Sequence, residues 1–200
     1  MNGPVIPVLT AQSADDAEQA SRALRAGGMT TVEITFRTEA AVESIRRAAR
    51  IEGLVVGAGT VLSEAQLVAA VEAGARFVVS PSTNETVVRA GRAAGVEVIP
   101  GAATPTEIDK ARALGCRIVK IFPASLLGGP AFVKAVSAVF PDARFVPTGG
   151  VSPDNLGEYL ALPSVLACAG TWICEPALLR EGRFDEIERR ARDALGLVPA

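Results

Sequence analysis

Histidine is absent from the 200 residues of the chain. Without an imidazole, the protein can form neither a Ser-His-Asp triad nor a histidine-ligated zinc site, and it has no histidine for acid–base catalysis. Carboxylate, amine, hydroxyl, thiol and backbone groups remain as candidate catalysts. Any enzymatic chemistry must therefore be built from these groups.

Cysteine and long apolar runs are also scarce. The three cysteines, Cys116, Cys168 and Cys174, are odd in number and do not have the spacing of metal ligands. This usage favours reduced thiols in a cytoplasmic protein over disulfides. No segment approaches the length of a membrane span, and the N-terminus MNGPVIPVLT does not resemble a signal peptide, so we expect no membrane contact.

The sequence also has no large excess of positive or of negative charge. The formal net charge is −2 at pH 7, and the basic clusters at 46–47 and 189–192 occur in helical patterns, which indicates solvated helix faces. We therefore expect no nucleic-acid partner. The length and the hydrophobic fraction of 49% suit one substantial core, so we expect a single domain over residues 1–200.

What is present is a regular alternation of short β-branched runs and Ala-, Arg- and Glu-rich helical patterns. The predicted strands are Pro4–Leu9, Thr31–Phe36, Leu54–Gly57, Arg76–Val79, Glu97–Ile99, Arg117–Phe122, Arg144–Val146 and Val165–Cys168. The predicted helices are Ser13–Ala26, Glu39–Arg50, Ser63–Ala73, Asn84–Ala94, Thr104–Leu114, Pro130–Val139, Pro153–Leu160 and Pro176–Leu195.

This alternation predicts parallel strands joined by right-handed crossovers. Eight strand–helix repeats without a linker predict an α/β fold of the (β/α)₈ (TIM) barrel type. An open doubly wound sheet is the alternative. It would favour a Gly-x-Gly-x-x-Gly turn, and the stretch GAGTVL at 57–62 lacks the third glycine.

Polar residues interrupt two of the predicted strands. Because side chains two apart on a strand face the same way, Glu33, Thr35 and Arg37 share one face of the second strand. Lys120 shares a face of the sixth strand with Phe122. The apolar residues between them suit packing under helices, so these polar side chains are expected to point into the barrel, where such enzymes carry their active sites.

Two interpretations of the buried lysine remain open. Lys120 and Glu33 could form a structural ion pair that only fills the barrel. Alternatively, burial and the neighbouring cation Arg37 favour an uncharged amine that attacks a carbonyl to form a Schiff base. Glu33 would then carry protons to and from the carbon next to the imine.

Glycine-rich turns follow the seventh and eighth predicted strands, at PTGGVS (147–152) and CAGTW (168–172). Many barrel enzymes hold a phosphate at these two strand ends with backbone N–H groups and hydroxyls. The sequence therefore predicts a phosphate site there. Thr60 and Pro81 follow other strands. Thr60 could donate its hydroxyl to a small acid and Pro81 could form a wall of the pocket, or each could belong to an ordinary turn.

With these residues assembled, the chain resembles the family of 2-keto-3-deoxy-6-phosphogluconate (KDPG) aldolases, which includes 4-hydroxy-2-oxoglutarate (KHG) and phosphogalactonate aldolases. The resemblance covers nearly the whole chain in order. Its motifs are GPVIPV at 3–8, VEITFRT at 32–38, VGAGTVL at 56–62, KIFPA at 120–124 and PTGGVS at 147–152.

The resemblance implies a class I aldolase without metal or other cofactor, in which Lys120 forms the Schiff base with pyruvate and Glu33 transfers protons. It implies that Arg37 and Thr60 hold the pyruvate carboxylate and that the rest of the substrate site comes from Pro81, Phe122, Thr148, Gly149, Gly150 and Thr171. The expected reaction cleaves a phosphorylated keto acid into pyruvate and glyceraldehyde 3-phosphate. The family also implies a homotrimer.

Three departures from the family pattern bear on these expectations. The chain begins almost at its first strand, so the N-terminal helix typical of the family is expected to be missing or replaced. Ser125 stands where close relatives carry Glu, and Thr171 stands where Ser is usual. Cleavage of KHG or of a phosphogalactonate therefore remains an alternative, as do a divalent-metal aldolase and a barrel that binds phosphorylated metabolites without catalysis.

Overall fold

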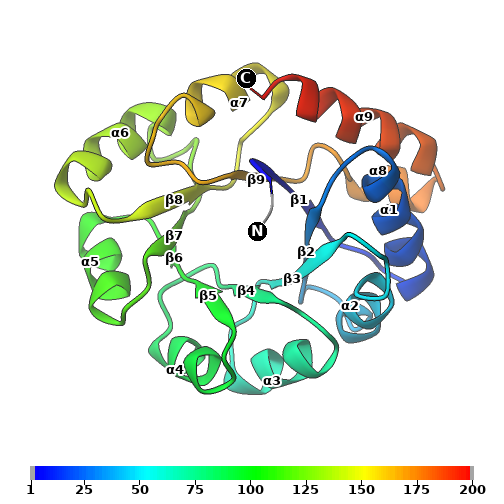
Figure 1. Cartoon of the computed structure of the whole chain (residues 1–200), viewed down its shortest axis with the longest axis horizontal. Helices are drawn as coiled ribbons and strands as arrows, with labels where there is room; N and C mark the ends of the chain where they lie inside the picture. Colours follow the sequence, from blue (N-terminus) through cyan, green and yellow to red (C-terminus); the bar gives the residue numbers. More distant parts are fainter. Residues whose placement is uncertain (1–2, 199–200) are drawn as a thin grey trace.

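The computed structural model describes residues 3–198 and has an α/β fold of parallel strands. The strands surround a common centre, and the helices lie outside them (Figure 1). The strands are β1 (Val5–Leu9), β2 (Thr31–Thr35), β3 (Val55–Gly59), β4 (Phe77–Val79), β5 (Glu97–Ile99), β6 (Gly101–Ala102), β7 (Ile118–Ile121), β8 (Arg144–Pro147) and β9 (Cys168–Gly170).

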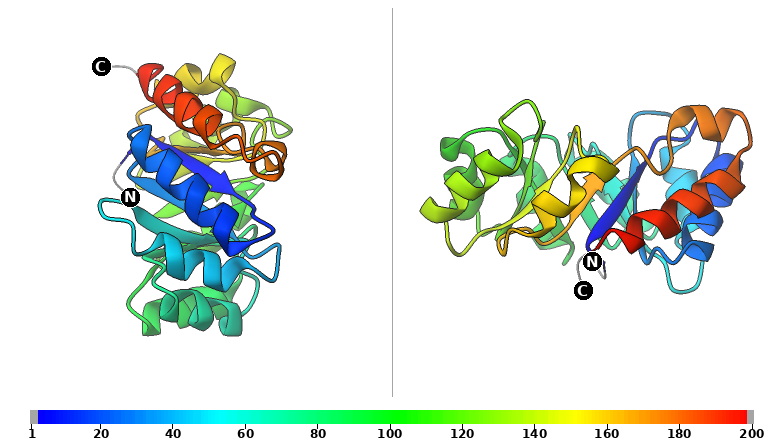
Figure 2. Two further views of the ribbon diagram at one scale, coloured as in Figure 1. Left: turned by 90° about the vertical axis from the view of Figure 1, so that its right-hand side faces the viewer. Right: turned by 90° about the horizontal axis from the view of Figure 1, so that it is seen from above.

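These strands form two curved parallel sheets. One has the order β5-β4-β3-β2-β1-β9, and the other has the order β6-β7-β8. Two isolated parallel bridges, Phe145 to Val165 and Thr148 to Ala169, connect β8 to the β9 segment. Because all strands run the same way, their carboxyl ends meet on one side of the molecule, as the side views show (Figure 2). The loops that follow the strands therefore lie together on that side of the molecule.

The helices are α1 (Ala14–Ala26), α2 (Ala41–Ala48), α3 (Glu64–Glu72), α4 (Glu85–Ala93), α5 (Pro105–Ala113), α6 (Gly129–Val139), α7 (Pro153–Leu160), α8 (Pro176–Arg180) and α9 (Phe184–Gly196). Side-chain caps fix the starts of three of these helices. The hydroxyls of Ser13, Ser63 and Thr104 accept the N–H of the third helical residue in α1, α3 and α5. No helix within residues 3–198 is long and apolar enough to cross a membrane.

Three elements differ from the sequence prediction. The single helix expected over 176–195 is divided into α8 and α9, because Gly182 adopts a left-handed φ of +64° between them. The short strand β6 was not expected. The last strand begins at Cys168 rather than Val165, which makes only an isolated bridge.

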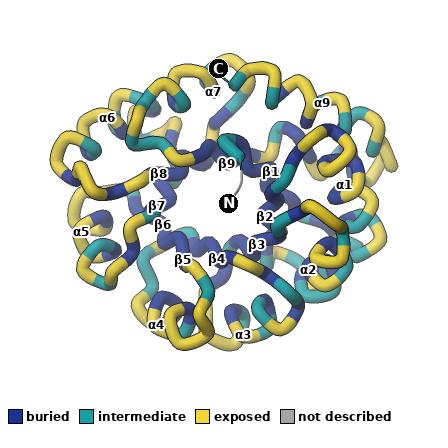
Figure 3. The backbone as a smooth tube through the Cα atoms, viewed as in Figure 1, coloured by how far each residue is buried: buried dark blue, intermediate teal, exposed yellow. Residues whose placement is uncertain are grey.

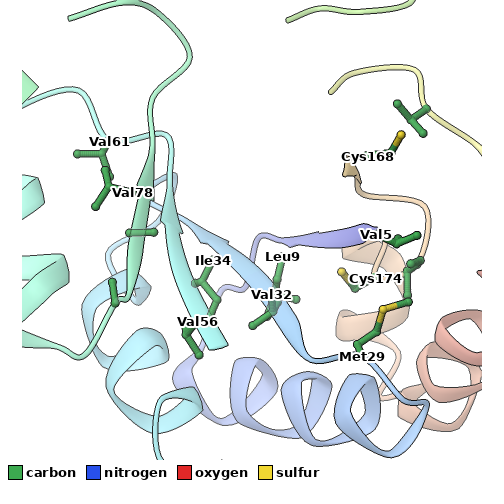
Figure 4. Close-up of a cluster of buried hydrophobic side chains, with 14 of the residues drawn as sticks. Val5, Leu9, Met29, Val32, Ile34, Val56, Val61, Val78, Cys168 and Cys174 are labelled. Carbon is green, nitrogen blue, oxygen red and sulfur yellow. The ribbon is translucent and has the colours of Figure 1, made fainter. Parts of the chain in front are cut away.

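The main core lies between the outer face of the strands and the helices. Val32, Ile34 and Val56 project from β2 and β3 into this layer (Figure 4). The strands and the inward sides of the helices are buried, whereas the outward sides of the helices are exposed (Figure 3). Smaller apolar clusters fill the inner face of the strands, including Val8 with Val146. The strands therefore have two distinct faces, one for the helices and one for the centre.

Candidate active site

Lys120 lies on the inner face of β7, as strand parity predicts. Its neighbours Val119 and Ile121 pack into the core under the helices. The backbone N–H of Lys120 donates to the carbonyl of Pro100 at 2.9 Å, which fixes the strand at this point. The residue is only 5% exposed. A charged side chain so deeply buried requires a partner.

That partner is Glu33 on the inner face of β2. The distance from Lys120 Nζ to Glu33 Oε1 is 3.6 Å, and Glu33 is 2% exposed. Among residues 3–198, Oε1 has no hydrogen-bond partner. The carboxylate therefore faces the amine as an ion-pair partner while one of its oxygens remains able to accept a proton or a hydrogen bond.

Gly59 makes room for this carboxylate. A Cβ atom at position 59 would lie 2.2 Å from Glu33 Oε1, far inside the contact distance of the two atoms. Gly59 pairs with Thr35 in the register of β2 and β3, so the glycine is directly beside the strand that carries the acid. The position of Glu33 therefore depends on the absence of a side chain at residue 59.

The surroundings of Lys120 bear on its charge in more than one way. Burial penalises the ammonium form of an amine, whereas an adjacent carboxylate stabilises it. The Phe122 ring adds a further attraction, since its centroid lies 5.3 Å from Lys120 Nζ, within the range of a cation–π contact. An adduct formed on Lys120 Nζ would lie directly beside the Glu33 carboxylate, whose Oε1 is 3.6 Å away.

Arg37 and Thr60 follow the paired ends of β2 and β3. The N–H of Phe36 donates to the carbonyl of Gly59 at 2.7 Å, so the residues that come next leave the sheet side by side. Arg37 is exposed and forms no ion pair with any residue of the 3–198 range. Thr60 has a φ of +57°, unusual for a residue with a side chain, and such strain is often found at functional sites.

Phe122 and Pro81 come from the loops after β7 and β4. Phe122 is half-buried, and a Cβ at Gly149 would lie 3.3 Å from its ring, so the ring lies against the turn after β8. Pro81 is half-buried as well, and its carbonyl oxygen occupies the space where Gly101 has no side chain. Gly101 pairs with Lys120 in the register of β6 and β7, so the Pro81 backbone lies beside the residue next to the lysine.

The two glycine-rich turns lie next to each other at the ends of β8 and β9. The bridge between Thr148 and Ala169 places them side by side. Gly149 and Gly150 both have left-handed φ values, +90° and +75°, a backbone conformation that glycine adopts without the strain of a side chain. Thr171 is exposed beyond β9.

Ser125 closes one side of this turn. Its N–H donates to the carbonyl of Gly149 at 3.0 Å, and its Oγ fills the space in which a Cβ of Gly150 would lie. The loop after β7 is thereby joined to the turn after β8.

One pair at the site was missed at the sequence level. The hydroxyls of Thr10 and Thr35 lie 2.8 Å apart, at the carboxyl ends of β1 and β2. Thr35 shares the parity of Glu33, which predicts an inward position, and the structure adds Thr10 as its partner. The signal was available, because Ile6 and Val8 occupy the inner face and Thr10 continues their alternation.

The thiols are poor candidates for catalysis. All three cysteines are free and buried. Burial raises the pKa of Cys168 and of Cys174 to about 12, so both stay protonated at neutral pH. In the described part of the chain, no three acidic or cysteine side chains are grouped so that they could hold a metal ion. Among the described groups, the buried amine and carboxylate are the best placed for chemistry.

Comparisons with known proteins agree with this geometry. The family model described as KDPG and KHG aldolase matches residues 1–190. A curated 2-dehydro-3-deoxy-phosphogluconate aldolase of Treponema pallidum is 44% identical over 196 residues, which cover 97% of this chain and 93% of the relative.

Two solved structures are also similar. The KDPG aldolase of Legionella pneumophila, with pyruvate captured as a covalent carbinolamine intermediate, superposes with a TM-score of 0.92 at 35% identity, covering 96% of this chain and 94% of its own. The enzyme of Zymomonas mobilis with 3-phosphoglycerate gives a TM-score of 0.91 at 36% identity, covering 98% and 93%. The chain belongs to the KDPG and KHG aldolase family.

Proposed function

We propose that the chain is a class I aldolase that cleaves KDPG into pyruvate and D-glyceraldehyde 3-phosphate. The observation that carries this proposal is the buried pair of Lys120 and Glu33, 3.6 Å apart on opposite strands of the ring. A buried amine beside a carboxylate with a free oxygen is suited to Schiff-base chemistry. Membership of the aldolase family supports the same reaction.

The reaction begins when the neutral amine of Lys120 attacks the C2 carbonyl. The carbinolamine loses water and becomes an iminium. The C4 hydroxyl then gives its proton to the Glu33 carboxylate, the C3–C4 bond breaks, and its electron pair enters the iminium to give an enamine. Glyceraldehyde 3-phosphate leaves with the new carbonyl. Glu33 protonates C3 of the enamine, and water hydrolyses the iminium to pyruvate and free Lys120.

The other residues bind the two ends of the substrate. Arg37 and Thr60 hold the carboxylate, because both follow neighbouring strand ends and Arg37 has no ion-pair partner among residues 3–198. Phe122 and Pro81 line the site. The turns with Thr148, Gly149, Gly150 and Thr171 hold the phosphate through backbone N–H groups and the Thr171 hydroxyl.

Borohydride trapping tests this proposal. Reduction in the presence of pyruvate should attach the three-carbon unit to Lys120, which intact mass and peptide mapping would locate. The matched control is the same experiment with Lys134, an exposed lysine on α6, changed to Arg; its adduct should be unchanged. A wild-type protein that yields no adduct, or one on another lysine, would refute the proposed nucleophile.

The alternative substrate within the family is unphosphorylated KHG, and Ser125 is the observation that keeps it open. Comparing kcat/KM for the two substrates decides between them. A functional phosphate site should strongly favour KDPG, whereas similar values would indicate KHG. A binding protein without catalysis would turn over neither substrate.

We further propose that both sheets act together as a closed (β/α)₈ barrel, that residues 1–200 form one domain, and that three copies assemble into a trimer in the cytoplasm. The two bridges between β8 and β9 support closure, and the free cysteines support a reducing compartment.

Sedimentation should give about three times the chain mass of 20.6 kDa. A monomer mass would contradict the trimer.

A further inference from the structure

The hydroxyl pair of Thr10 and Thr35 has no role in the reaction as described above. Thr10 follows β1, and Val8 of that strand pairs with Glu33 in the register of β1 and β2. Two residues further on, Thr10 lies opposite Thr35, and their hydroxyls are 2.8 Å apart. The pair therefore lies beside the catalytic acid, one step closer to the open ends of the strands.

This position is between the two ends of the substrate site. In the sheet, β1 separates β2, which leads to Arg37, from β9, which leads to Thr171. A substrate held by its carboxylate near β2 and by its phosphate near β9 must place its middle carbons near the carboxyl end of β1. Those carbons carry the hydroxyl groups that distinguish one sugar acid from another.

The hydrogen-bonding capacity of the pair is not used up. Two hydroxyls contain two protons, and their mutual bond needs only one of them. Thr35 is 1% exposed, whereas Thr10 is half-buried, so Thr10 is the member that a substrate can reach. By contrast, the Thr148 hydroxyl donates to the carbonyl of Val146 at 3.3 Å, within its own strand.

We propose that Thr10 is a specificity-determining residue whose hydroxyl, positioned by Thr35, binds the C5 hydroxyl of the substrate. This inference rests on the proposed aldolase activity. In the direction of synthesis, C5 derives from C2 of glyceraldehyde 3-phosphate. The protein should therefore prefer this aldehyde to 3-phosphooxypropanal, which has the same phosphate and chain length but lacks the hydroxyl.

The test measures addition of pyruvate to both aldehydes by wild-type protein and by Thr10→Val. Valine has nearly the same shape as threonine without the hydroxyl. One neutral hydrogen bond corresponds to about 1 kcal/mol, so the preference for glyceraldehyde 3-phosphate should fall roughly fivefold. Thr10→Ser should restore it, and Thr35→Val should lower it by a smaller amount, because Thr35 acts only through Thr10.

The matched control is Thr38→Val. The Thr38 hydroxyl is also close to the site but is bound to the carbonyl of Ala11 at 2.7 Å, so its removal should affect both aldehydes equally. If Thr10→Val lowers both rates equally, or lowers neither, the specificity role is refuted. Pyruvate trapping on Lys120 needs no aldehyde, so failure of trapping in the wild-type protein would instead refute the aldolase proposal.

Discussion

The two faces of the strands have opposite chemistry. The outer face of β2 carries Val32 and Ile34, which pack under the helices, whereas its inner face carries Glu33 and Thr35. In β7, Val119 faces outward and Lys120 inward. Because consecutive side chains alternate, each strand contributes to stability with one set of residues and to chemistry with the other. Mutations on the two faces should therefore have separable effects.

The largest expected effect is on the inner face. Lys120→Arg keeps a positive charge opposite Glu33 but removes the amine that forms a Schiff base. We expect kcat to fall by on the order of 10⁴-fold or more, while the circular dichroism spectrum and melting transition remain near those of the wild type. Significant turnover by this variant would show that another group is the nucleophile.

The outer face should respond in the opposite way. Ile34 is 1% exposed in the core between β2 and the helices. Ile34→Ala should lower the free energy of unfolding by about 2–5 kcal/mol because it leaves a cavity, as urea denaturation would show. The kcat of the folded fraction should stay at the wild-type level. A large loss of kcat without loss of stability would contradict the separation of the two faces.

Gly59 tests how sharply the inner face is constrained. Gly59→Ala would place a methyl group against the Glu33 carboxylate, so the acid must move. We expect kcat to fall by roughly 10–100-fold, since small displacements of catalytic groups are costly. The control is Gly157→Ala in α7, where a Cβ meets no atom within 4 Å and should be neutral or slightly stabilising. Equal activity of the two variants would be inconsistent with a tightly fixed Glu33.

The last effect appears only at high pH and concerns a thiol in the outer core. The raised pKa of Cys174, about 12, exceeds that of an exposed thiol near 9. The unfolded chain therefore releases its proton at lower pH, and the stability provided by the neutral buried thiol is complete below pH 9 and is lost as pH rises toward 12. The loss is about 1.4 kcal/mol per pH unit. Above pH 9, the urea midpoint should fall less steeply with pH for Cys174→Ala than for the wild type. Parallel curves would show that ionisation of Cys174 is not the cause of the pH dependence.

Much of this arrangement follows from local sequence rules. Alternation along β2 and β7 predicted the inward positions of Glu33 and Lys120. The two-residue strand β6 is too short to produce a periodic pattern, and the break at Gly182 depends on one backbone conformation. The pairing of Thr10 with Thr35 and the contact at Gly59 depend on register between strands, which one strand alone does not reveal.

Trp172, the only tryptophan of the chain, lies next to the exposed Thr171 in the turn after β9. Its ring occupies the space left by the missing side chain of Gly170, and its carbonyl accepts a hydrogen bond of 2.7 Å from Arg190. The protein therefore contains a single indole fluorophore, held in place beside the proposed phosphate turn. Excitation of that indole would report ligand binding as a change in emission, without any label and without turnover.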